Sequence, residues 1–148
     1  MDVTKLQEFG RRYTAAWCSQ NAASVATFFA EGASLKINKG LPAVGRKAIE
    51  AVAQDFMSAF PDMVVTMDGI DIEGDQVVYR WTLTGTNSGA GGTGQSVRIS
   101  GHEKWTIAAD SLIADSKGHF DDAEYNRQLK HGFAEGSENP GTRKSSSV

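Results

Sequence analysis

The segment EGDQVVYRWTLTGT, residues 73–86, contains the clearest two-residue periodicity in the chain. Its apolar side chains, Val77, Tyr79, Trp81 and Leu83, alternate with polar ones, which is typical of a strand with one buried face. The letters EGD in front of it are a turn signal, because glycine adopts a positive φ at little cost. The segment therefore predicts the second strand of a β-hairpin.

Further helices and strands are predicted on both sides of this hairpin. Upstream, apolar residues recur at three- and four-residue steps, which is typical of amphipathic helices. The predicted elements are helices over 3–18, from Asn21 to about Glu31 and over 45–59, strands over 34–37, 63–72, 76–86, 96–107 and 111–120, and a last helix over 121–131. Helices that precede a run of strands favour an α+β fold with an antiparallel meander. We expect one domain over residues 1–131 and a disordered polar tail over 132–148.

Size and charge exclude several classes of protein. The chain has 148 residues, with 15 Lys and Arg against 18 Asp and Glu, a net charge of −3. This balance excludes a strongly basic nucleic-acid binder and gives no electrostatic reason to sit on an anionic membrane. A single cysteine, Cys18, excludes an intrachain disulfide and a cysteine-based zinc site. The N-terminal MDVTKLQEFGRRY has no apolar stretch, so we expect a soluble, cytoplasmic protein.

A glycine-rich stretch, GAGGTG at residues 89–94, matches the spacing of a dinucleotide-binding loop. It lies between two predicted strands, however, whereas that loop needs a helix N-terminus to hold the pyrophosphate. We interpret it as a mobile hairpin loop near the mouth of a pocket.

The titratable side chains near the last hairpin allow two interpretations. His102 and His119 can approach each other across it, and His131 lies where the last helix ends. Asp121 and Asp122 follow the last strand, where an acidic side chain caps the next helix. The alternative is a carboxylate base at the rim of a pocket, which needs partial desolvation to raise its pKa.

Three segments of the chain resemble a known family. They are GLPAVGRKAIEAVAQDFMSAFPDM (40–63), EGDQVVYRWTLTGTNSGAGGTGQ (73–95) and IADSKGHFDDAEYNRQL (113–129). Together they are similar to SnoaL-like polyketide cyclases, within the nuclear transport factor 2-like superfamily that includes ketosteroid isomerase. The resemblance spans about residues 5–131. It implies a cone-shaped α+β barrel, in which a strongly bent, mainly antiparallel sheet wraps around N-terminal helices and encloses a deep apolar pocket, and it implies a homodimer.

The resemblance also implies a reaction and a catalytic residue. In SnoaL-like cyclases an aspartate near the end of the last strand is the acid/base of an intramolecular aldol closure. The spacing of that motif is matched by Ile113, Asp121 and Gln128-Leu129, so Asp121 is the corresponding position. No metal or organic cofactor is implied. Two positions depart from many relatives, which have histidine in place of Asn87 and tryptophan in place of Lys117.

These observations lead to one functional expectation and two alternatives. We expect a cofactor-free aldol cyclase or isomerase that abstracts a proton next to a carbonyl of a small apolar or polycyclic ligand, without nucleic-acid or membrane partners. The expected catalytic residues are Asp121, His119 and His102, and the expected substrate-binding residues are Tyr13, Trp17, Phe28, Phe56, Trp81, Asn87 and Trp105. The first alternative is a non-catalytic binding or dimerisation module in which Asp121 is only a helix cap. The second is hydrolysis or dehydration, with Arg80, Arg98 and Asp121 as the polar groups.

The direction of Asp121 depends on the register of the last hairpin. A two-residue turn at Ala109-Asp110 sets Asp121 opposite Arg98 and His119 opposite Ser100. Asp121 then shares a polar face and points away from an apolar cavity. A bulge or a change of one residue in the turn reverses that facing.

Overall fold

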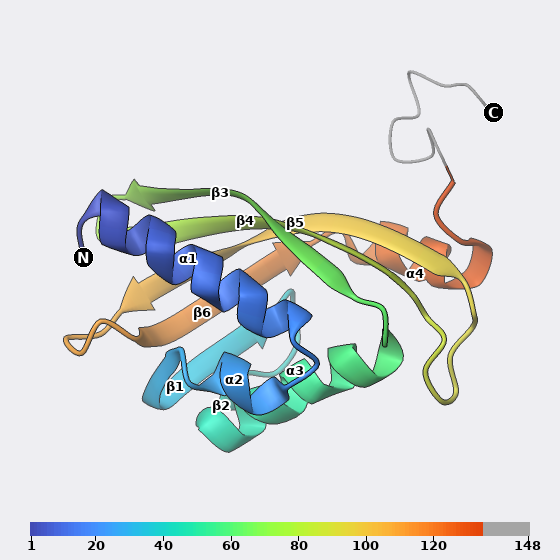
Figure 1. Ribbon diagram of the computed structural model, residues 1–148, viewed down its shortest axis with the longest axis horizontal. Coiled ribbons are helices and arrows are strands. Elements are labelled where there is room, and N and C mark those ends of the chain that lie inside the picture. The colour runs from blue at the N-terminus through green and yellow to red at the C-terminus, as the bar shows by residue number, and fades with distance from the viewer. Residues whose placement is uncertain (135–148) are drawn as a thin grey trace.

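A curved six-stranded sheet forms the body of the protein, and helices pack against its concave side (Figure 1). The computed structural model describes residues 1–134. Its elements are α1 (Val3–Cys18), α2 (Ala22–Ala26), β1 (Phe29–Ile37), β2 (Ala43–Val44), α3 (Arg46–Ala59), β3 (Val64–Glu73), β4 (Gln76–Thr86), β5 (Ser96–Ile107), β6 (Ile113–Phe120) and α4 (Asp122–His131). The strand order is β2-β1-β6-β5-β4-β3, in which β3 to β6 form an antiparallel meander and β1 runs parallel to β6. The predicted α+β class with a bent, mainly antiparallel sheet is confirmed.

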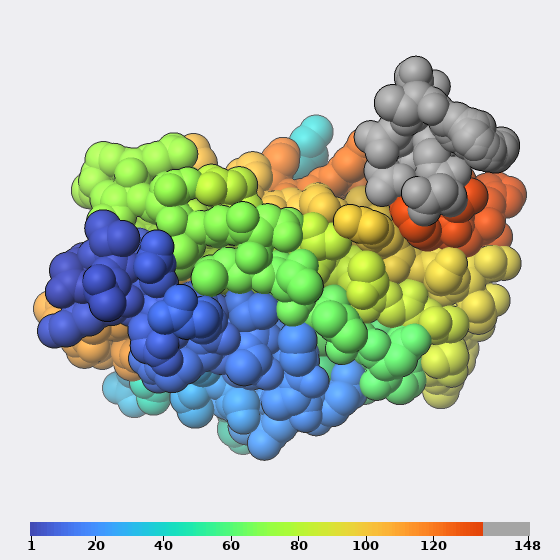
Figure 2. All heavy atoms as spheres, turned by 45° about the horizontal axis from the view of Figure 1, so that its top comes forward, coloured from blue at the N-terminus to red at the C-terminus, as the bar shows by residue number. Residues whose placement is uncertain are grey.

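Helix α1 lies along the sheet because its sequence gives it one apolar face. Asp2 caps its N-terminus by accepting a hydrogen bond from the Lys5 backbone N–H at 2.8 Å. The buried face contains Leu6, Phe9, Tyr13 and Ala16. Figure 2 shows α1, in blue, beside the green strand β3. Within residues 1–134, no helix has the length and apolar character needed to span a membrane.

The segment that follows α2 differs from the prediction. The sequence periodicity extended a helix to about Glu31, but α2 ends at Ala26 and β1 already begins at Phe29. Phe29 is fully buried and pairs with Ile113 of β6, far away in the sequence. Gly32 has a φ of 79°, and the register shifts between Phe29 and Ser34. Pairing with a distant strand therefore overrides the local helical pattern.

The hairpin of β5 and β6 has a longer connection than predicted. His102 pairs with His119 and Lys104 with Lys117, so the predicted register was wrong by two residues. The cause is that β5 ends at Ile107 and β6 begins only at Ile113. A shift of two residues keeps every side chain on its predicted face, because the side-chain period of a strand is two.

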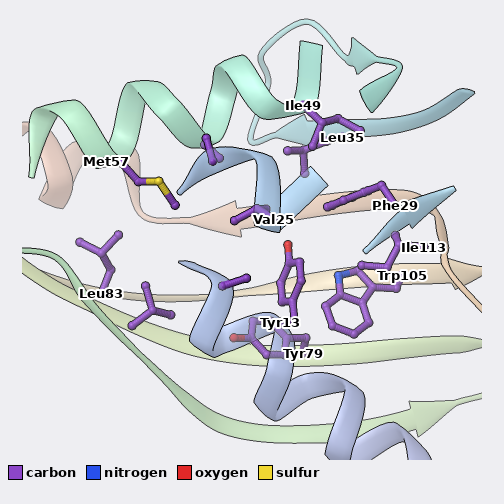
Figure 3. Close-up of a cluster of buried hydrophobic side chains, with 14 of the residues drawn as sticks. Tyr13, Val25, Phe29, Leu35, Ile49, Met57, Tyr79, Leu83, Trp105 and Ile113 are labelled. Carbon is purple, nitrogen blue, oxygen red and sulfur yellow. The ribbon is translucent and has the colours of Figure 1, made fainter. Parts of the chain in front are cut away.

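Buried aromatic side chains form the centre of the core (Figure 3). Tyr79 and Trp105 stack with ring centroids 5.0 Å apart, and the Tyr13 ring meets Trp105 edge-on at the same distance. Figure 3 shows the Tyr13 hydroxyl and the Trp105 nitrogen beside each other, whereas the Tyr79 hydroxyl points another way. The Tyr13 and Trp105 polar groups are therefore placed to meet one common partner.

Two peripheral segments are held in place more firmly than the sequence indicates. In the glycine-rich stretch, the Gly89 backbone N–H donates to Ala59 O at the end of α3 (3.3 Å), so the loop packs against that helix. In the predicted tail, Gly132 is buried and the Phe133 N–H donates to Ser96 O of β5 (2.6 Å). The rest of the predicted tail, 135–148, lies outside the described residues.

Candidate active site

An apolar cavity lies between the helices and the inner face of the sheet. The centre of a water-sized molecule can occupy about 70 Å³ of this cavity. Its walls are Trp17, Leu35, Ile37, Phe56, Val65, Tyr79, Trp81, Leu83, Ile99, Glu103, Gly118, His119, Phe120 and Tyr125. Glu103 is the one carboxylate among these wall residues, and it is only 8% exposed. A cavity of this kind suits an apolar ligand with one polar group.

Three side chains hold one oxygen of the Glu103 carboxyl group. Its Oε1 accepts hydrogen bonds from the Tyr13 hydroxyl (2.9 Å), the Trp105 Nε1–H (2.9 Å) and the Ser116 hydroxyl (2.8 Å). Its other oxygen, Oε2, has no hydrogen-bond partner among residues 1–134, and these residues do not fully enclose it. The side chain is therefore fixed at one oxygen and available at the other.

The surroundings of Glu103 raise its pKa. Burial is the main cause, and the hydrogen bonds from Trp105, Ser116 and Tyr13 act in the opposite direction. The pKa of Tyr13 is also raised well above its usual range, by burial first and by the nearby Glu103 second, so this hydroxyl stays protonated and donates. Because Oε1 already accepts three hydrogen bonds, a proton taken up by Glu103 goes to Oε2. A carboxyl group arranged in this way can act as a general acid or base.

The wall residue Trp17 has an indole N–H without a hydrogen-bond partner. Its indole N–H lies near enough to the Tyr13 hydroxyl to lower the pKa of that group, but it makes no hydrogen bond of normal geometry. It is the one fully enclosed side-chain polar atom of the described residues without a partner. A buried polar group left unpaired in this way is costly.

Glu103 was not among the predicted site residues, although the sequence contains a signal for it. Along β5 the inward positions Val97, Ile99 and Trp105 are apolar and buried, and Glu103 shares their facing. An acidic residue on the apolar face of a strand indicates a buried and perturbed carboxyl group. The prediction followed the family motif to Asp121 instead.

The structure places Asp121 at the N-terminus of α4, outside the cavity wall. Its carboxylate accepts a hydrogen bond from the Glu124 backbone N–H at 3.0 Å, and the residue is exposed. This is the geometry of a helix cap, which was the alternative reading of Asp121. Neighbouring Lys117 is also exposed and forms an ion pair with Asp115.

The two histidines come together, but on the outer face of the sheet. The rings of His102 and His119 lie side by side with centroids 5.7 Å apart, as the sequence suggested they could. Burial first, and then His119, lowers the pKa of His102. His119 is exposed and reaches the cavity edge, whereas His102 is not part of the wall. Neither histidine contacts Glu103 by a hydrogen bond.

The predicted substrate-binding residues divide into three groups. Trp17, Phe56 and Trp81 line the cavity. Tyr13 and Trp105 lie behind its wall and hold Glu103. The remaining two, Phe28 and Asn87, are not part of the wall: Phe28 packs against Phe9 and Tyr13, and Asn87 orders the glycine-rich loop through Ala59 and Thr93.

If Asp121 acts as a cap, its removal should affect stability rather than the cavity. We expect Asp121→Ala to lower the free energy of unfolding by about 0.5–2 kcal/mol, because the Glu124 N–H loses its acceptor. Urea unfolding followed by circular dichroism measures this. A variant of unchanged stability that loses ligand turnover would return the catalytic role to Asp121.

The raised pKa of Glu103 makes stability depend on pH. A carboxyl group whose folded pKa is raised stabilises the protein below its unfolded pKa, near 4.5, and this contribution is lost as pH rises through the folded value. Glu103→Gln cannot ionise, so its stability relative to the wild type should increase from pH 4 to pH 8. Urea unfolding at both pH values checks this, and a difference that does not vary with pH contradicts it.

A curved, mainly antiparallel sheet packed against helices is the fold of nuclear transport factor 2-like domains. The model of the SnoaL-like polyketide cyclase family matches residues 7–129, and the chain belongs to this family. Comparison with curated protein sequences gives no match.

Solved structures share the fold at low sequence identity. TsrD from Streptomyces laurentii has 21% identity and a TM-score of 0.75, over 87% of this chain and 97% of that one. A protein of ketosteroid isomerase-like fold from Catenulispora acidiphila, in complex with trimethylamine, has 17% identity and a TM-score of 0.73, over 82% and 92%. SalBIII, described as an epoxide hydrolase/cyclase-like enzyme in pyran ring formation of salinomycin, has 15% identity and a TM-score of 0.71, over 83% and 95%. Likeness at this identity concerns the fold alone.

Proposed function

We propose that the protein is a cofactor-free enzyme that transfers a proton next to a carbonyl group of an apolar ligand, with Glu103 as the acid/base. One observation carries the proposal: Glu103 is buried at the wall of an apolar cavity, fixed through Oε1 and unpartnered at Oε2. We thus assign to Glu103 the role that the resemblance gave to Asp121.

The reaction begins when ionised Glu103 takes a proton from the carbon next to the carbonyl. The C–H bonding pair forms the enolate double bond, and negative charge moves to the ligand oxygen. The proton on Oε2 then returns to carbon in an isomerisation. In an aldol closure the enolate carbon attacks a second carbonyl, and the proton goes to the new alkoxide.

Other parts of the expected function are proposals of the same kind. The family match and the SalBIII neighbour, described as cyclase-like, favour ring-closing chemistry on a polycyclic ligand. A homodimer follows from the resemblance, and light scattering after gel filtration tests it. A cytoplasmic location is a further part of the proposal.

A second candidate is a binding protein without catalysis. The almost wholly apolar wall favours it, because such a cavity holds an apolar ligand without any reaction.

One experiment separates the two candidates. 2-Indanone is a small planar ketone with acidic C–H groups on both sides of its carbonyl. Incubation with the protein in D₂O, followed by NMR, should show exchange of these protons above the buffer rate. Exchange at the buffer rate would favour the binding protein.

A further inference from the structure

Gly118 lies at the centre of the sheet, directly beside the candidate acid/base. It pairs with Glu103 of β5 on one side and with Ile37 of β1 on the other. All three residues line the cavity. A side chain at position 118 would therefore occupy the cavity next to the Glu103 carboxyl group.

The fold itself does not require glycine at position 118. A Cβ atom there would lie 3.5 Å from Lys36 O, 3.8 Å from Glu103 Cγ and 3.8 Å from Ile37 Cγ1, which are ordinary contacts. Its φ is not in the positive region. A glycine inside a strand weakens that strand and packs nothing.

Gly101, two pairs further along the same hairpin, is the contrasting case. A Cβ at Gly101 would lie 2.3 Å from His119 O and 2.7 Å from Trp81 Cζ2. Glycine is needed there for steric reasons. The absence of a side chain at Gly118 has no such explanation, and its effect is to leave space beside the carboxyl group.

We propose that Gly118 is a specificity-determining residue: the polar end of the ligand lies over Gly118, and the carbon next to its carbonyl group faces Oε2 of Glu103. The assignment of Oε2 as the group that meets the ligand rests on the proposed function. Apart from Glu103, the buried wall residues are apolar or aromatic, so the part of the ligand that they enclose is apolar. The substrate class is an apolar body whose carbonyl or hydroxyl groups lie together at one end, beside Glu103.

The test compares two ligands of the same shape, 2-indanone and indane, which lacks the oxygen. Quenching of the fluorescence of Trp17 and Trp81 gives both dissociation constants. Gly118→Ala should weaken 2-indanone about tenfold relative to indane, because the added methyl group displaces the polar end. Comparing this ratio between Gly118→Ala and the wild type cancels the difference in hydration between the two ligands. Thermal unfolding of Gly118→Ala should be unchanged or higher in Tm, since no contact is broken.

Two control variants sharpen the result. Val65→Ile adds one carbon elsewhere in the wall and should leave the ratio unchanged. Gly101→Ala should lower Tm. The proposal is overturned if the ratio is unchanged in Gly118→Ala, if its Tm falls as far as that of Gly101→Ala, or if the wild type binds neither ligand. Failure of the proposed function is distinct: exchange of 2-indanone protons would be equal in the wild type and Glu103→Gln, while the ratio still changes in Gly118→Ala.

Discussion

Glu103→Gln should slow the proton exchange of 2-indanone by about 10²–10⁴-fold, the usual contribution of a positioned general base. The glutamine side chain has the same shape, and its carbonyl oxygen can keep the hydrogen bonds from Tyr13, Trp105 and Ser116. The amide nitrogen then stands where Oε2 was and cannot accept a proton. The rate of deuterium incorporation measures the effect, and circular dichroism checks that the fold is retained.

The matched control for this variant is Asp121→Asn. Asparagine is also a good cap, so this change should leave both stability and exchange close to the wild type. Exchange that survives in Glu103→Gln but disappears in Asp121→Asn would contradict our assignment. The wild-type rate should also rise with pH, with a midpoint above the ordinary glutamate pKa, because burial raises the pKa of Glu103.

Local sequence patterns predicted those helices and strands whose formation depends on their own residues. The period of 3.6 residues placed α1 and α3, and the alternation from Gln76 to Thr86 placed β4 with its observed bounds. β1 was predicted too short because it forms by parallel pairing with β6, about 80 residues away, and no local pattern encodes that pairing. The register of β5 and β6 depends on the length of their connection, which the residues at 108–112 leave open.

The candidate site was harder to predict than the fold. An acidic residue between a strand and a helix, such as Asp121, looks the same in sequence whether it caps the helix or faces a pocket. Glu103 is a candidate because it is buried and because it accepts a hydrogen bond from Tyr13, which is 90 positions away in the chain. Sequence periodicity could have placed Glu103 on the inner face, but only the tertiary structure shows the three donors on its Oε1.

Trp105 connects this site to the stability of the whole domain. Its ring is fully buried, stacks on Tyr79 and meets Phe9 edge-on with centroids 5.6 Å apart. The same side chain donates a hydrogen bond to Glu103. The residue that positions the carboxyl group is therefore also one of the largest side chains in the core.

Trp105→Ala should lower the free energy of unfolding by about 3–5 kcal/mol, since it leaves a large cavity in the core. That is a large part of the roughly 5–15 kcal/mol of a typical domain. Denaturant unfolding followed by far-ultraviolet circular dichroism measures it. A loss below about 1 kcal/mol would contradict a central role for this ring.

Trp105→Phe separates packing from hydrogen bonding at the same position. Phenylalanine keeps most of the buried ring, so the loss of stability should be smaller than in Trp105→Ala. In the wild type, the hydrogen bond from the Trp105 indole lowers the pKa of Glu103. Trp105→Phe removes this donor, so the pKa of Glu103 should rise further. The midpoint of the pH dependence of exchange should then move to higher pH. A midpoint that stays unchanged in Trp105→Phe would show that Glu103 is not the titrating group.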